Sequence, residues 1–409
     1  MNLESKKLTK AIESKVDRSK WVKWKFSDLV ENIVEKVTPK KSGLEAYIGL
    51  KHLDTGSLKI RRYGKCSEIS GDKLKIYKGD LIFAKRNSYL KRVAIADFEA
   101  VASAHSLVLR AKSENVLPEF LPFFMMSEAF WIRAIEISVG SLSPTINWRV
   151  LAKQEFLLPP KEKQAELAEL LWSMDEVIEK EGNLYNSINI AKNSFFENYL
   201  RQGLENETFK KVTVGDIAAP SKHSCVGGPF GSDLSGKHYV EEPGVPVIRG
   251  ANLSSGEVEF IDEGFVYVST DKAEKLSRNM AFRGDVVVTQ RGTLGQVGII
   301  PKNSKFERYV VSQSQMKLQV DANKAIPEFV YYYLLSSRSQ HELTIATICT
   351  GIPHINLGIF KKMKILLPSL QSQKEIVNKI QHFEVALQSQ RVQIMNSKSL
   401  QKSLINQVF

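Results

Sequence analysis

The segment Gly231–Lys237 has the spacing of a phosphate-binding loop: a glycine, four intervening residues, a second glycine and a lysine. Such a loop needs Ser or Thr after the lysine, because that hydroxyl binds the magnesium ion of the nucleotide. Here that position is His238. Residues 221–229 do not have the pattern of a strand, and Pro243 interrupts any long helix after the loop. The sequence therefore argues against a nucleotide hydrolase, and we expect the two glycines to serve tight turns.

Motifs for other chemistry are incomplete. Leu158-Pro-Pro-Lys161 lacks both flanking residues of the Asn/Asp-Pro-Pro-Tyr/Phe motif used in adenine methylation. The segment Gly292–Gly298 contains three glycines but opens no predicted helix, so it is a poor match to a cofactor loop. His341-Glu-Leu-Thr lacks the second histidine of a zinc-protease helix. The sequence predicts no metal site and no catalytic centre.

Composition favours a globular protein with an acidic partner. The chain has 409 residues, 43% of them hydrophobic and 25% charged, which excludes fibrous and disordered classes. The net charge of +12 favours nucleic acid as the partner, although a merely soluble basic protein would have the same excess. We expect no membrane span, no secretory signal, and a cytoplasmic protein whose three cysteines are inert thiols.

The sequence contains an internal repeat. The blocks 144–147, 157–164 and 117–120 recur at 353–356, 366–373 and 326–329, each 209 positions later. Earlier blocks recur at smaller offsets: 78–86 at 283–291, 47–53 at 247–253, and 26–29 at 214–217. The order of the blocks is the same in both halves. A rigid rear part is therefore common to both copies, and a variable part precedes it.

Each rigid part contains a long predicted helix. Residues 162–200 contain no proline and a single glycine, Gly182, and residues 371–409 contain neither. Apolar residues recur at the three- and four-residue spacing of one helix face. These residues are Leu167, Leu171, Met174 and Ile178 in the first segment, and Ile376, Ile380, Phe383 and Leu387 in the second. The two helices could bury these faces on each other, or each could pack on its own globular domain.

The variable parts are predicted to be mixed α+β. Residues 81–84 and 286–289 have the pattern of buried strands after a Gly-Asp turn. Residues 119–133 and 328–340 have the pattern of short aromatic-rich helices. Residues 1–20 are expected to form a basic amphipathic helix or a solvated tail.

Two α+β units, each followed by a long helix, resemble the specificity (S) subunit of type I restriction–modification enzymes. The resemblance rests on blocks that are duplicated in order, and it covers nearly the whole chain. These blocks are Gly228–Ser232, Val247–Leu253, Gly284-Asp285 with the following strand, and the helix entries 157–164 and 366–373. The first half departs from the pattern, since it has no Gly-Pro-Phe-Gly-Ser segment.

The resemblance implies an α+β fold with two tandem target-recognition domains, 21–158 and 206–367, followed by helices 159–205 and 368–409 that form an antiparallel, coiled-coil-like spacer. Each domain would read one half of a split double-stranded DNA target. The helices would dock two methyltransferase subunits, and a motor-nuclease subunit could join. The chain would be non-catalytic, with S-adenosylmethionine, ATP and magnesium bound by its partners.

Base reading needs hydrogen-bonding side chains that match the groove edges, with arginine suited to guanine and Asn or Gln to adenine. In the first half we expect DNA contacts from Lys85, Arg86, Asn87, Tyr89, Lys91 and Arg92, with Arg61 and Arg62 as a second group. In the second half we expect them from Gln290, Arg291, Thr293 and Gln296, with Ser232, Lys237, Arg249 and Asn252 nearby in the pattern. For any one of them the alternative is a solvated surface residue.

The repeated Asn147 and Asn356 could bind DNA or a partner, but a capping role is the favoured interpretation. Two other functions remain open at this point: a basic helical adaptor without sequence recognition, and a self-contained nucleotide-dependent enzyme.

Overall fold

The computed structural model describes residues 18–241, 244–256, 258–349 and 351–409. The helix or tail predicted for residues 1–20 lies outside the described residues up to position 17. The chain forms two compact units. Unit 1 comprises the chain up to Leu184 together with Gln390–Phe409, and unit 2 comprises Tyr185–Ser389. The boundary therefore passes through both long helices, whereas the sequence pattern suggested helical segments separate from the globular parts.

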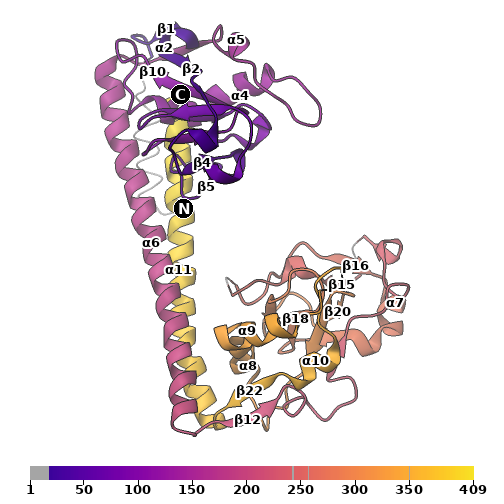
Figure 1. Ribbon diagram of the computed structural model, residues 1–409. Helices are drawn as coiled ribbons and strands as arrows, with labels where there is room; N and C mark the ends of the chain where they lie inside the picture. Colours follow the sequence, from indigo (N-terminus) through magenta and orange to yellow (C-terminus); the bar gives the residue numbers. More distant parts are fainter. Residues whose placement is uncertain (1–17, 242–243, 257, 350) are drawn as a thin grey trace. The chain divides into compact units, whose positions relative to one another are not determined.

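Unit 1 contains two main sheets (Figure 1). One has the order β2-β10-β7-β8 and is antiparallel, and the other has the order β3-β6-β9-β4-β5 and contains one parallel pair, β4 with β9. A short ribbon pairs β1 with β11. The strands are β1 (Val22–Lys25), β2 (Val30–Ile33), β3 (Lys36–Val37), β4 (Ala46–Ile48), β5 (Gly64–Lys65), β6 (Lys73–Ile76), β7 (Leu81–Ala84), β8 (Val93–Ile95), β9 (Ala100–Ala102), β10 (Ser106–Ala111) and β11 (Glu155–Leu158). The short helices are α2 (Phe26–Leu29), α3 (Leu121–Met126), α4 (Glu128–Glu136) and α5 (Trp148–Leu151).

Unit 2 repeats this plan. Its sheets have the orders β13-β21-β18-β19 and β14-β16-β15-β20-β17, and β12 pairs with β22. The strands are β12 (Lys210–Thr213), β13 (Cys225–Gly227), β14 (Tyr239–Val240), β15 (Val245–Ile248), β16 (Val266–Val268), β17 (Met280–Phe282), β18 (Val286–Thr289), β19 (Val297–Ile299), β20 (Arg308–Val311), β21 (Gln315–Leu318) and β22 (Lys364–Leu367). The short helices are α7 (Thr270–Lys275), α8 (Pro327–Leu335), α9 (Ser337–Ala346) and α10 (Leu357–Lys362).

The sequence repeat is reproduced in the strand register. The parallel pair of unit 1 aligns Ile48 with Ala102, and that of unit 2 aligns Ile248 with Val311. The predicted strands 81–84 and 286–289 are β7 and β18, and both are buried along their whole length. The glycines before them have φ of 93° and 87°, and the following Asp80 and Asp285 accept hydrogen bonds from the backbone amides of Tyr77 and Phe282. The predicted Gly-Asp turns are thus confirmed.

Each aromatic-rich helix predicted as one segment is two helices. The break falls at Ser127 in unit 1 and at Ser336 in unit 2. Each serine has an extended backbone, and its hydroxyl accepts a hydrogen bond from the amide three residues later, 3.2 Å from Phe130 N and 3.3 Å from Ser339 N. A serine that caps a new helix in this way ends the preceding one, a possibility that apolar periodicity does not reveal.

The two long helices are α6 (Lys161–Glu205) and α11 (Leu370–Val408). They run antiparallel where they meet in each unit. In unit 1, Gln401 Nε2 donates to Leu171 O and Ser397 Oγ donates to Glu181 Oε1. In unit 2, Lys192 is buried and pairs with Glu384 at 2.8 Å.

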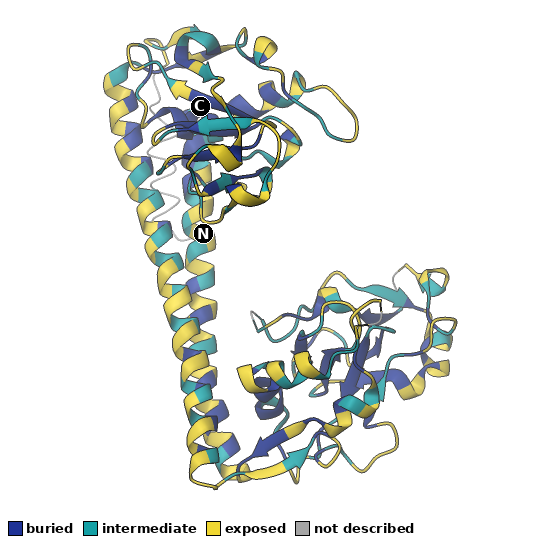
Figure 2. Cartoon of the chain, in the orientation of Figure 1, coloured by how far each residue is buried: buried dark blue, intermediate teal, exposed yellow. Residues whose placement is uncertain are grey.

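Both packing modes considered for the helices occur. Of the eight predicted apolar positions, Leu167, Leu171, Ile178, Ile376, Ile380 and Leu387 are buried, and Met174 and Phe383 are partly buried. Leu171 shares a core with Phe120 and Leu404, and Ile380 shares one with Phe329 and Phe196. The helices therefore contact each other and also complete the core of each unit, while their outer faces are exposed (Figure 2).

An equivalent buried glutamine lies at the start of each long helix. Gln164 and Gln373 are 1% and 0% exposed. Gln164 Oε1 accepts from Leu117 N at 2.9 Å, and its Nε2 donates to Pro159 O at 2.9 Å. Gln373 makes the same two bonds with Ile326 N (2.8 Å) and Pro368 O (2.9 Å). Each side chain therefore ties the start of a long helix to a loop 47 residues earlier in the sequence.

The structure describes all three cysteines, which the sequence analysis expects to be inert, as free thiols. Cys66 and Cys225 are buried, and burial raises the pKa of both thiols, that of Cys225 to about 11. Cys349 is exposed. Within the part of the chain that the structure describes, no helix is long and apolar enough to cross a membrane.

Candidate nucleic-acid interface

Three loops of unit 2 meet at one place. Gln290 N donates to Ser314 O at 2.8 Å, and Ile355 N donates to Gln290 O at 2.9 Å. Gly292 N donates to Pro353 O at 3.1 Å. These backbone bonds join the loop after β18 (residues 290–296), the turn between β20 and β21 (residues 312–315), and the hairpin that precedes α10 (residues 348–354).

A fourth segment, Gly228–Gly231, is fastened to the same place. Gly228 N donates to Gln315 O at 2.8 Å, and Gln313 Nε2 donates to Gly231 O at 3.2 Å. A Cβ atom on Gly228 would lie 1.9 Å from Ser312 O, so this position requires glycine. The backbone of Gly228–Gly231 thus packs against the turn that carries Gln313.

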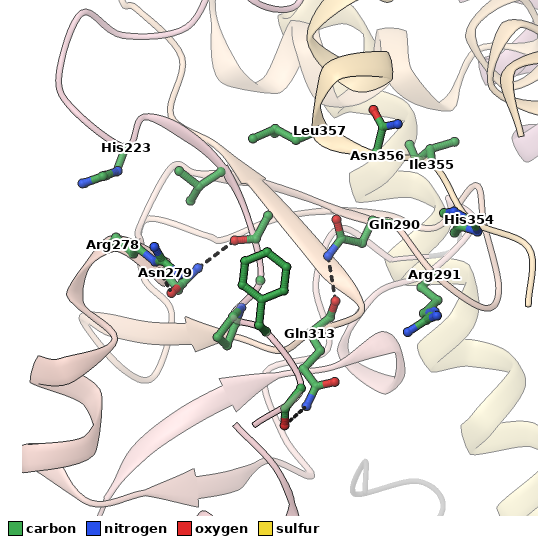
Figure 3. A pocket seen from close by; sticks show the side chains of 16 residues that line it. His223, Arg278, Asn279, Gln290, Arg291, Gln313, His354, Ile355, Asn356 and Leu357 are labelled. Atoms are coloured by element: carbon green, nitrogen blue, oxygen red, sulfur yellow. Dashed lines mark hydrogen bonds between the residues drawn. The ribbon is translucent and has the colours of Figure 1, made fainter. Parts of the chain in front are cut away.

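The four segments enclose an open cleft of about 520 Å³ (Figure 3). His223 and Arg278 lie on one side of it, and Arg291 and His354 lie on the other. No described residue that lines the cleft is acidic. A concave surface with cationic groups on two sides and amide side chains between them suits an anionic ligand with hydrogen-bonding edges.

Unit 1 brings the equivalent loops together. Ile146 N donates to Lys85 O at 2.8 Å, Ser88 N donates to Pro144 O at 3.3 Å, and Arg86 forms an isolated bridge with Thr145. The pKa of His105, in the turn between β9 and β10, is lowered by burial and then by the charges of Arg86, Lys85 and Lys73. The loop 85–92 therefore places positive charge beside the turn 103–106 and the hairpin 139–145.

Some predicted unit 1 residues are placed to contact a ligand and others are not. Arg86 and Tyr89 are exposed, and Lys85 is half-buried, where desolvation lowers the pKa of its ammonium group. Four of the remaining predicted side chains make contacts within the unit. Arg61 donates to Ser57, Arg62 pairs with Asp54, Lys91 pairs with Glu128, and Arg92 donates to Leu50 O. The backbone of Asn87 has φ 57° at the start of a 3-10 turn, and its buried Oδ1 has no hydrogen-bond partner.

In unit 2 the predicted residues of the loop after β18 lie at or near the cleft, whereas those near position 250 do not line it. Gln290 and Arg291 line the cleft, and Thr293 is exposed on the same loop. Gln296 is partly buried, and its Oε1 accepts from Thr289 Oγ1 at 3.2 Å. Ser232 and Lys237 are exposed but do not line the cleft.

Asn252 and Arg249 are structural. Asn252 is fully buried; its Oδ1 accepts from Arg249 N, and its Nδ2 donates to Ile261 O and Glu263 O. Arg249 donates to Gly264 O at 3.3 Å. The expectation that Asn252 contacts DNA is therefore wrong, because every hydrogen-bonding atom of its side chain is used inside the unit. Its equivalent in unit 1, His52, accepts from Gly49 N at 3.0 Å in the same kind of turn.

The asparagines of the repeated Pro-x-Ile-Asn block are caps, as favoured. Asn147 Oδ1 accepts from Arg149 N at 2.9 Å at the start of α5. Asn356 Oδ1 accepts from Ile359 N at 2.8 Å at the start of α10. Asn356 also lines the cleft, so its cap positions the end of the adjoining hairpin.

The sequence did not single out Arg278, Gln313, His354 or Phe230 as ligand-binding residues. Arg278 joins the cleft because the neighbouring Asn279 donates to Gly227 O at 2.7 Å, across 52 residues of sequence. His354 joins the cleft because its backbone forms an isolated β-bridge with that of Arg291. Only Phe230 had a usable signal, as an aromatic residue between two glycines.

The glycine-rich segments do not form nucleotide loops. A strand, β13, does precede Gly231–Lys237, contrary to the sequence interpretation, but only a three-residue 3-10 turn (Gly236–His238) follows it. Gly231 and Gly236 lie in tight turns closed by Asp233 N to Phe230 O and His238 N to Ser235 O. Gly292 and Gly295 have φ of 94° and 90° in a turn that leads into β19, not into a helix. Among the described residues, no group of three or more His, Cys, Asp or Glu could hold a metal ion.

A family model, the type I restriction modification DNA specificity domain, matches this chain twice, over residues 18–189 and 206–396. The chain belongs to this family. The two matches include residues of both units, so the converging loops described above for each unit belong to two specificity domains.

Curated relatives are also specificity subunits. The chain is 24% identical over 277 residues to the type I restriction enzyme MjaVIII specificity subunit of Methanocaldococcus jannaschii, a match that covers 65% of this chain and 64% of that protein. It is 23% identical over 411 residues to the putative MjaX specificity subunit of the same organism, covering 94% and 92%. The first match thus spans just under two thirds of its relative's length, and the second spans nearly all of it.

The fold recurs in a solved structure. The type I restriction–modification S subunit from M. genitalium aligns with a TM-score of 0.51 at 14% identity, covering 97% of this chain and 98% of that one. This agreement supports two specificity domains, each followed by a long helix, as the architecture of the chain.

Proposed function

We propose that this chain is the DNA-recognition subunit of a type I restriction–modification complex, and that each unit reads one half of a split double-stranded target. The observation that carries the proposal is the duplicated set of converging loops, each with an exposed arginine, Arg86 in unit 1 and Arg291 in unit 2. The net charge of +12 agrees with a ligand that carries many phosphates.

The two surfaces differ in the residues that would read bases. Unit 1 presents Lys85, Arg86, Tyr89 and His105, whereas unit 2 presents Gln290, Arg291 and Thr293. Arginine suits guanine and glutamine suits adenine in the major groove. The two half-sites are therefore expected to differ in sequence.

The outer face of the helices supports docking of methyltransferase subunits. Leu170, Val177 and Leu184 recur every seven residues on α6 and are 45%, 50% and 51% exposed. On α11, Val385 and Val392 are 70% and 46% exposed at the same spacing. An exposed apolar row with heptad spacing is the surface that a partner helix covers in a coiled coil. The predicted positions such as Leu171 and Ile380 instead face the chain's own core.

In this proposal the chain is non-catalytic. S-adenosylmethionine, ATP and magnesium would be bound by the methyltransferase and motor-nuclease subunits, and the specificity subunit would supply only the target.

The test is to co-express the chain with a type I methyltransferase subunit, select from a random duplex library, and sequence the retained DNA. A two-part motif separated by an unread gap is the expected result. Retention of DNA without an enriched motif would refute sequence recognition and favour a basic adaptor. Binding of ATP or S-adenosylmethionine by the isolated chain would instead favour an enzyme.

Docking has its own test. Changing Val177 to Asp places a charge in the exposed row and should abolish co-purification with the methyltransferase. Because the side chain is half exposed, the variant should still fold. Asn186→Asp, on an exposed side chain about half a turn around the same helix from Val177, is the matched control and should co-purify normally.

A further inference from the structure

Phe230 is the feature of the cleft that phosphate binding leaves unexplained. Its side chain is 78% exposed, yet it lines a cleft whose other side chains include two arginines and two histidines. A phenylalanine is normally buried, since burying its ring is worth about 1.5–3 kcal/mol. An exposed ring beside polar ligand-binding groups marks a contact that is completed only by the ligand.

The backbone that carries the ring is held in place before any ligand arrives. Phe230 O accepts from Asp233 N at 2.8 Å, and the adjoining Gly231 O accepts from Gln313 Nε2. Two residues earlier, Gly228 is packed against Ser312 O. Pro229 fixes one further backbone dihedral between these anchors. The backbone of Phe230 is therefore preorganised, which lowers the entropy lost on binding.

Phe230 shares its cleft with the side chains proposed to read bases. Gln313 Nε2 binds the backbone next to the ring, and Gln313 O accepts from Gln290 Nε2 at 2.6 Å. Gln290 and Arg291 need the major groove, where the hydrogen-bonding edges distinguish all four base pairs. A ring in the same cleft faces the same groove.

The major groove exposes one apolar group among the four standard bases, the C5-methyl of thymine. We propose that Phe230 contacts this methyl group and thereby specifies a thymine in the half-site read by unit 2. This inference rests on the proposed function, because it assigns one base of the target that unit 2 would read.

The experiment begins with the selected target. The full chain, in complex with its methyltransferase subunits, is used to enrich duplexes from a random library. The half-site of unit 2 is the half whose sequence preference changes with R291A. That half should contain at least one fixed thymine on either strand. If the wild-type complex enriches no motif, the proposed function fails and this inference fails with it. If a motif is enriched but its unit 2 half contains no fixed thymine, only this inference fails.

The decisive step removes the methyl group alone. Each fixed thymine is replaced by deoxyuridine, which keeps the same hydrogen-bonding edge. At one position the wild-type complex should bind about fourfold more weakly, the effect of one buried methyl group. F230A should bind the unmodified target about tenfold more weakly, and the deoxyuridine replacement should then have no further effect. F230L, which keeps an apolar side chain, should restore part of the sensitivity.

Controls separate this role from general surface effects. Ile345 in α9 is 72% exposed and does not line the cleft, so I345A should retain both the wild-type affinity and the deoxyuridine sensitivity. Equal deoxyuridine sensitivity in wild type and F230A would overturn the proposal. A second overturning result has two parts: deoxyuridine replacement has no effect, and the fluorescence of 2-aminopurine placed in the half-site rises when wild type binds but not when F230A binds. That result would show that the ring inserts between stacked bases.

Discussion

Replacing Gln373 by methionine should destabilise unit 2 without affecting unit 1. Methionine has a similar shape but cannot bond to Ile326 N or Pro368 O, the two backbone groups that Gln373 satisfies at 2.8 and 2.9 Å. Gln373 is 0% exposed, so water cannot replace its side-chain amide. An unsatisfied buried group costs about 1–3 kcal/mol, which gives a loss of roughly 2–4 kcal/mol in the free energy of unfolding. The reciprocal change, Gln164→Met, should cause the same loss in unit 1.

The tryptophans allow the two units to be monitored separately. All five lie at positions 21–172, within unit 1, and they line or adjoin its core. Tryptophan fluorescence therefore reports the unfolding of unit 1, whereas far-UV circular dichroism reports both units. For Q164M we expect the fluorescence midpoint to fall by roughly 5–15 °C.

For Q373M we expect an unchanged fluorescence midpoint and an earlier circular dichroism transition. Surface changes at Gln371, an exposed residue on the same helix, should leave both signals unchanged. Equal shifts of the fluorescence midpoint in Q164M and Q373M would refute the reasoning, because they would mean that Gln164 and Gln373 do not stabilise separate units.

Three further predictions concern recognition, pH and helix length. R291A should relax one base position in the half-site of unit 2 at a cost of about 1–3 kcal/mol, measured by selection from a random library, and an unchanged preference would remove Arg291 from the reading surface. Burial and the charge of Lys51 lower the pKa of His52 in the folded state below its unfolded value, so stability is lost as pH falls below about 6.5. H52N, which places the unit 2 residue Asn252 at this position, should therefore reduce the loss of stability of unit 1 between pH 7.5 and 5.5, measured by tryptophan fluorescence. An identical pH dependence in wild type and H52N would contradict this. Inserting seven residues into both long helices adds about 10.5 Å to each, so the gap between half-sites should lengthen by about three base pairs if the helices set it, and an unchanged gap in the selected motif would show that they do not.

The sequence determined the duplicated plan of this protein. Blocks repeated in the same order predicted two α+β units, because each copy needs the same local chemistry in the same sequence of elements. The Gly-Asp turns before β7 and β18, the asparagine caps of α5 and α10, and the apolar faces of α6 and α11 all depend on residues within a few positions of one another. Short-range periodicity and turn chemistry therefore sufficed.

Only the tertiary structure decided which polar residues face a ligand. Asn252 and Arg278 are both plausible DNA contacts by residue type. Asn252 is buried, and its amide donates to the carbonyls of Ile261 and Glu263, whereas Arg278 reaches the cleft because its neighbour Asn279 binds Gly227, 52 residues earlier. Exposure depends on which segments pack together, and residue type does not encode that. The chain's local patterns specify its elements, but the packing of loops distant in sequence determines its recognition surface.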